Sequence, residues 1–140
     1  MTSHTKTTWS IEYILRIYSS GENNLVIPPW KRSWTWDSAH GLTLMQGLIE
    51  SIFANRKIPG IAVVYDKQSN KYILDDGRHR VETLVRFVDN LFPIIIGGHA
   101  VFFKDLSAES VSIFLNYEID VKIENYSLAH CKEAILRELS

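Results

Sequence analysis

Two central parts of the chain carry apolar residues at the spacing of an α-helix. Residues 42–56 are expected to form one helix, with a buried face made of Met45, Leu48, Ile49, Ile52 and Phe53. Residues 79–91 are expected to form another, with a stripe made of Val81, Leu84, Val85, Val88 and Leu91. Each stripe covers one face only, which is typical of helices packed on the core of a globular protein.

Three further helices are predicted from the residues that would cap them. Residues 10–20 are expected to be helical, with Ser10 as the N-cap and Trp9 as the hydrophobic residue before it. Ser107 and Ser127 each precede another amphipathic segment, so we expect one helix to begin after each serine.

The segments between these helices predict strands. Residues 60–77 contain two strands joined by a short polar turn, and residues 118–124 alternate like a third strand. A second hairpin is expected to turn at Gly97 and Gly98. Residues 23–37 are expected to be extended, because their two prolines exclude a helix.

Strands and helices follow one another without a strict alternation, which favours an α+β fold with a small mixed sheet and flanking helices. The chain shows no linker, internal repeat or low-complexity segment. We therefore expect residues 1–140 to form a single domain, with residues 1–8 as a flexible tail.

Charge and cysteine content narrow the classes of function. The net charge of −1 argues against a protein that binds nucleic acid over its whole surface. Residues 1–86 nevertheless hold 11 Lys and Arg against 8 Asp and Glu, so an anion site is expected in this half. The single cysteine, Cys131, excludes an intrachain disulfide and a cysteine metal cluster. No signal peptide or membrane span is visible, so we expect a cytoplasmic protein without membrane contact.

The stretch "DDGRHR", residues 75–80, is the strongest candidate for chemistry. It lies where a strand is expected to give way to a helix, and the first turn of a helix attracts anions. Gly77 would let a phosphate approach the backbone, while Arg78 and Arg80 would bind its oxygens. His79 would donate to a phosphate or move a proton, and Asp75 or Asp76 would hold a divalent cation.

Structural interpretations of the same stretch stay open. Asp76 would also serve as an N-cap, and the glycine as part of a tight turn. The arginines would then form a solvated first turn, although the positive end of a helix dipole disfavours cations there. The sequence contains no P-loop, dinucleotide fingerprint, nucleophile elbow or histidine spacing of a metal site.

A second candidate is the aromatic and basic segment at residues 27–37. Trp30, Trp34 and Trp36 alternate, so they are expected to share one face and to pack on the core. Arg32, in the same segment, is expected to reach the phosphate site of Arg78 and Arg80.

The order of three motifs resembles the N-terminal domain of GmrSD-type modification-dependent restriction proteins, within the ParB/sulfiredoxin-like superfamily. The motifs are "VIPPWKRSWTWD", "LIESIFANRKIPGIAVV" and "YILDDGRHRVETLVRFV". The family has an "IPxYQRxYxW" segment, a "LIxSI" helix followed by "IP", and a "DGQQR" motif before a Thr-Leu helix. The segment "FFKDLSAESVSIFLNYEIDVKIE" is also similar to the family, so the likeness runs from about Trp9 to the end of the chain.

The resemblance implies a ParB/sulfiredoxin-like α+β fold that binds a nucleoside triphosphate with Mg²⁺. It also implies, in many members, hydrolysis coupled to DNA restriction and phage defence. Asp76, Gly77 and Arg80 match the Asp, Gly and Arg of the "DGQQR" motif, and Arg32 matches the Arg of "IPxYQR". From the residue chemistry and the resemblance together, Asp76 and His79 are the expected catalytic residues. Arg32, Gly77, Arg78 and Arg80 are the expected phosphate-binding residues, and Asp76 is the expected metal ligand.

Departures from the family pattern keep other functions open. Arg78 and His79 replace its two glutamines, and the chain stops before the family's "F-x-R-L-N" element. Arg78 also stands where sulfiredoxins carry their nucleophilic cysteine, which argues against that branch. A DNA-binding or nuclease module, and an interaction domain that lost catalysis and acts with a further domain or partner protein, remain alternatives.

Overall fold

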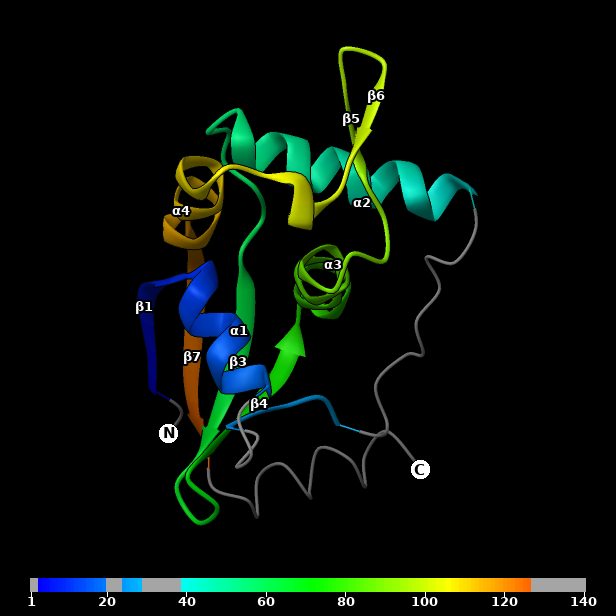
Figure 1. Cartoon of the computed structure of the whole chain (residues 1–140). Helices are drawn as coiled ribbons and strands as arrows, with labels where there is room; N and C mark the ends of the chain where they lie inside the picture. The colour runs from blue at the N-terminus through cyan, green and yellow to red at the C-terminus, as the bar shows by residue number, and fades with distance from the viewer. Residues whose placement is uncertain (1–2, 20–23, 29–38, 127–140) are drawn as a thin grey trace.

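The computed structural model describes residues 3–19, 24–28 and 39–126 of the chain. It shows an α+β fold with a five-stranded mixed sheet, a small hairpin and four α-helices in this part of the chain (Figure 1). The strands of the main sheet are β1 (Ser3–Ser10), β2 (Leu25–Val26), β3 (Ile61–Asp66), β4 (Lys71–Asp76) and β7 (Glu118–Tyr126). The expected fold class and mixed sheet are thus confirmed.

The spatial order of the sheet is β1-β7-β3-β4-β2. The last described strand, β7, lies between the first strand and β3. It runs antiparallel to β1 and parallel to β3. β4 is antiparallel to β3, as expected for a hairpin, and β2 runs parallel to β4.

The helices are α1 (Ile11–Ser19), α2 (Ala39–Phe53), α3 (Arg78–Val88) and α4 (Ala108–Asn116). Figure 1 shows α1 and α3 beside the central strands, while α2 crosses one end of the molecule. The hairpin of β5 (Ile94–Ile96) and β6 (His99–Val101) stands above α2, and a short 3-10 turn, η1 (Phe103–Asp105), follows it.

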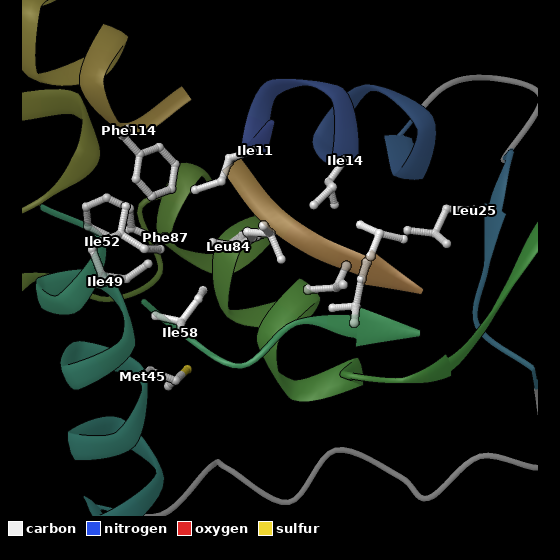
Figure 2. Packing of buried hydrophobic residues seen from close by; sticks show 14 of the residues in the cluster. Ile11, Ile14, Leu25, Met45, Ile49, Ile52, Ile58, Leu84, Phe87 and Phe114 are labelled. Carbon is white, nitrogen blue, oxygen red and sulfur yellow. The ribbon is translucent and has the colours of Figure 1, made fainter. Parts of the chain in front are cut away.

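One hydrophobic core joins the sheet to all four helices. Phe87 of α3 lies at its centre, and its ring centroid is 5.5 Å from that of Phe114 in α4 and 5.7 Å from that of Phe92. Figure 2 shows Phe87 and Phe114 beside Ile52 of α2 and Ile11 of α1. This packing fixes the position of α3, and with it the stretch "DDGRHR" at the start of that helix.

Most predicted elements are present, and two details of the helices differ. α2 begins at Ala39, before the expected residue 42. In α3 the buried side chains include Thr83 and Phe87, whereas Leu91 lies beyond the helix and is 64% exposed. The predicted stripe ran too far because the helix ends at Val88 and Asp89 caps it. The helix expected after Ser127 lies outside the described residues.

The expectation of a flexible tail at residues 1–8 is wrong for residues 3–8, which belong to β1. Every residue of β1 has a register partner in β7. Trp9 anchors the end of this strand, with its ring 5.2 Å from Tyr13 of α1 and 4.9 Å from Tyr72 of β4. Within the described ranges no helix is long and apolar enough to cross a bilayer.

Candidate functional site

The candidate site is built around Gly77, the single residue between β4 and α3. Its backbone has φ 101° and ψ 20°, a left-handed conformation that residues with a side chain rarely adopt. A Cβ on this residue would lie 2.6 Å from Cγ2 of Ile61 in the neighbouring strand. Both the dihedral angles and the available space therefore require glycine at this turn.

Gly77 is also the N-cap of α3, and this excludes the alternative in which Asp76 caps the helix. No side chain accepts a hydrogen bond at this cap. The carbonyl of Gly77 accepts the helical bond from the Val81 N–H at 3.0 Å. The first turn contains no acidic residue and begins Arg78, His79, Arg80, so the helix end carries cationic groups at its positive pole.

Arg80 turns back from α3 toward the sheet. Its Nη1 donates a hydrogen bond to the carbonyl oxygen of Gly60 at 2.5 Å, and lies 3.9 Å from Oδ2 of Asp76. The side chain of Arg80 is 26% exposed, whereas that of Asp76 is 74% exposed. Both contacts use Nη1, which leaves Nε and Nη2 of the guanidinium as further donors.

Arg78 points to another part of the molecule. Its Nε donates to Oε1 of Glu82, one turn further along α3, at 3.2 Å, and both side chains are largely buried. Tyr18 of α1 belongs to the same group of side chains, because burial and then the charge of Glu82 raise its pKa while Arg78 lowers it. Since Arg78 and Arg80 are two positions apart, they leave the helix on nearly opposite sides.

The structure therefore divides the predicted site residues into groups. It brings Asp76, Gly77 and Arg80 together, and it joins Arg78 to Glu82 instead. His79 is half-buried, and its carbonyl accepts a 2.6 Å hydrogen bond from Oγ1 of the buried Thr83. Arg32 and the three neighbouring tryptophans lie outside the described residues.

A divalent cation at this turn would need ligands beyond the protein side chains that the structure describes. Asp75 and Asp76 are both exposed at the end of β4. The described residues contain no group of three His, Cys, Asp or Glu side chains that could hold a metal ion. Mg²⁺ usually takes one or two carboxylates together with phosphate oxygens and water, so Asp76 fits Mg²⁺ only as part of a nucleotide complex.

Gly60 is a part of this site that the sequence did not identify. Its carbonyl receives Arg80, and a Cβ on it would lie 2.4 Å from the backbone oxygen of Asp120 in β7. Gly60 thus lets the chain pass close to β7 just before β3 begins. In the sequence, Gly60 stands directly before the apolar residues of β3. A glycine in this position can mark a close approach of two backbones, but which backbone it approaches is known only from the strand order.

Comparisons of the chain with protein-family models, with curated proteins and with solved structures found no match.

Proposed function

We propose that this chain is a nucleoside-triphosphate-binding domain of the ParB/sulfiredoxin-like kind, with the phosphates held at the turn from β4 to α3. The observation that carries this proposal is the arrangement at Gly77. A glycine in the left-handed conformation opens a helix whose first turn has two arginines, a histidine and no acid. Repulsion between the two arginines and the helix dipole is relieved when an anion binds there.

In this proposal Arg80 is the principal phosphate ligand. Its bond to Gly60 holds the guanidinium in place, so little side-chain freedom is lost when the remaining donors bind phosphate oxygens. Arg78 leaves the helix on nearly the opposite side, so in this proposal it contributes positive charge at longer range. Arg32 remains a proposed second phosphate ligand because of its place in the resembling motif.

Asp76 would hold Mg²⁺ between its exposed carboxylate and the phosphates, and His79 would serve as an acid or base in hydrolysis. The protein would act by positioning and by neutralising charge, as is general for phosphoryl transfer. A role in DNA restriction and phage defence follows from the resemblance and remains part of the proposal.

The test is a thermal-shift screen against ATP, CTP, GTP and UTP, with and without Mg²⁺. A nucleotide at about 100 times its dissociation constant adds about 2.7 kcal/mol to the free energy of unfolding. For a chain of this size that raises Tm by several degrees. We expect a shift that depends on Mg²⁺ with one nucleotide.

Variants separate binding from folding. Arg80→Ala should abolish the shift, but it also removes the bond to Gly60 and will lower Tm without ligand. Arg80→Lys keeps the charge and should retain part of the shift. Arg86→Ala, in the last turn of the same helix, should leave the shift intact. A protein that no nucleotide stabilises, or an Arg80→Ala variant that is stabilised as much as wild type, would refute the proposal.

A further inference from the structure

The outer edge of the main sheet at β1 is a long strand that is paired on one side only among the described residues. β1 is the terminal strand of the sheet, pairs over eight residues with β7, and lies at the left of the molecule in Figure 1. Residues 4–8 are all exposed. The backbone N–H and C=O groups that point away from β7 therefore have no strand to pair with in the described part of the chain.

This edge has few of the features that usually protect edge strands. Natural proteins block such edges with proline, with bulges, with charged side chains or with very short strands. β1 contains no proline, has an unbroken register with β7, and carries Lys6 as its single Lys, Arg, Asp or Glu. Its Thr5, Thr7 and Thr8 are β-branched residues that favour an extended backbone.

The edge of β1 carries a lysine whose positive charge an acidic group of a partner would neutralise. Lys6 stands directly opposite Lys122 in the β1–β7 register, and like charges in this position destabilise a sheet. Lys122 is neutralised by Glu124, since its Nζ lies 3.1 Å from Oε1 of that residue. Lys6 is exposed and has no ion-pair partner among the described residues.

A shallow hollow of about 650 Å³ lies beside Lys6, on the face of the sheet that both lysines share. Lys6, Thr8, Asp120 and Lys122 are among the residues that line it, together with Gly60. The one acid there, Asp120, already has Lys57 as a partner at 3.0 Å. A carboxylate entering the hollow from outside β1 would therefore meet the ammonium group of Lys6.

We propose that the edge of β1 binds an extended acidic segment of a partner protein, which adds to the sheet as a sixth strand. Main-chain hydrogen bonds to β1 supply the affinity. A glutamate or aspartate of the added strand sits by Lys6 and the hollow, and so sets the preference for acidic sequences. The proposal rests on β1 alone and does not depend on nucleotide binding at Gly77.

The probe is a fluorescein-labelled peptide, as long as β1, in which threonine and glutamate alternate. Binding to the whole chain is followed by fluorescence anisotropy. We expect saturable binding that weakens about tenfold with Lys6→Glu. Lys67→Glu makes the same charge change at an exposed position in the turn between β3 and β4, and should bind like wild type. A peptide with lysine in place of glutamate should not bind.

Two N-methylated versions of the peptide test strand addition itself. Alternate N–H groups of a strand point to the same edge, so methylating the threonine amides or the glutamate amides blocks one edge at a time. One version should lose binding and the other should keep it. If both bind equally, contact is purely electrostatic and the proposal fails.

Three other results would also overturn it. The first is equal binding of the glutamate and lysine peptides. The second is a protein that sediments as a dimer and binds no peptide, which would assign the edge to a second copy. The third is an absence of peptide binding together with binding of a thymidine oligonucleotide that Lys6→Glu weakens. That result would assign the lysine to nucleic acid.

Discussion

At the residue scale, the strongest constraint on this chain is at Gly77. Its positive φ, its contact with Ile61 and the 3.2 Å that would separate a Cβ from Nη1 of Arg80 all act at one position. The same absence of a side chain that lets β3 and α3 approach each other would let a phosphate approach the backbone. Structural need and proposed function therefore coincide at this glycine, and they have to be separated by experiment.

Gly77→Ala should lower the free energy of unfolding by about 2–3 kcal/mol, because alanine strains the left-handed backbone and contacts Ile61. Gly47→Ala is the matched control. Gly47 lies inside α2, and a Cβ on it would have no atom within 4 Å, so this change should stabilise the protein by up to about 1 kcal/mol. Chemical denaturation measures both. Equal effects of the two substitutions would contradict the account of Gly77.

Two tyrosines should make stability depend on pH in the alkaline range. Burial raises the pKa of Tyr72, with smaller contributions from Tyr13 and Tyr65, and burial also raises the pKa of Tyr18. The neutral phenol is thus favoured in the folded state. This stabilisation is fully present below the unfolded pKa of about 10 and is lost as pH rises through the folded pKa.

The free energy of unfolding should accordingly fall above pH 10, and Tyr72→Phe should make that fall less steep. Denaturant unfolding at a series of pH values provides the measurement. An identical slope in wild type and variant would show that Tyr72 does not contribute to it.

At the element scale, local signals in the sequence located most helices and strands correctly. Ser10 accepts a 3.1 Å hydrogen bond from the Tyr13 N–H, and Ser107 accepts one of 3.2 Å from the Ser110 N–H, as their positions predicted. Gly97 and Gly98 both have positive φ, the requirement of a tight hairpin turn. Caps and turns depend on adjacent residues, and for this reason they can be recognised without knowing the fold.

Ser10→Ala and Ser107→Ala should each cost about 1 kcal/mol of unfolding free energy, because each leaves a helix N–H without its acceptor. Ser112→Ala, within α4, removes a serine whose hydroxyl accepts a bond from the side chain of Asn116. It should change stability by less than half as much. Thermal unfolding compares the three, and a larger loss for Ser112→Ala would contradict the capping role.

β1 was missed for the opposite reason. Its sequence has threonines and serines where an amphipathic strand would have apolar residues, and its stability as a strand comes from β7, more than a hundred positions away along the chain. A pattern within residues 3–10 cannot show that a strand so far along the chain pairs with them. From its β-strand propensity alone, this segment could not be distinguished from a polar tail.

Hydrogen exchange tests β1 directly. Amides of residues 3–8 that point to β7 should exchange slowly, while the alternate amides on the outer edge should exchange rapidly. Amide-resolved exchange by NMR distinguishes the two sets. Equally fast exchange of all these amides would contradict the pairing of β1 with β7 and would support the interpretation of residues 3–8 as a flexible tail.

At the scale of the whole molecule, strand order decides what the candidate site contains. The sequence placed Asp76, Gly77 and Arg80 in one turn, and the structure confirms their proximity. The sequence did not predict that Gly60 would receive Arg80, because this contact depends on how the segment before β3 packs against α3. The pair of Arg78 and Glu82 has i,i+4 spacing within α3, so it could have been recognised from the sequence and was missed. The contents of a turn could be predicted from the sequence, but its partners from distant segments could not.

Phosphate binding at the turn from β4 to α3 is tested by an NMR titration of the isotope-labelled chain with the stabilising nucleotide and Mg²⁺. If phosphates bind where the account places them, the largest amide shifts will occur at residues 77–80, with smaller changes near Gly60, and the amides of β1 will not respond. Shifts that avoid residues 77–80, or a spectrum that no nucleotide alters, would contradict the account. The left-handed glycine turn would then have only a structural role.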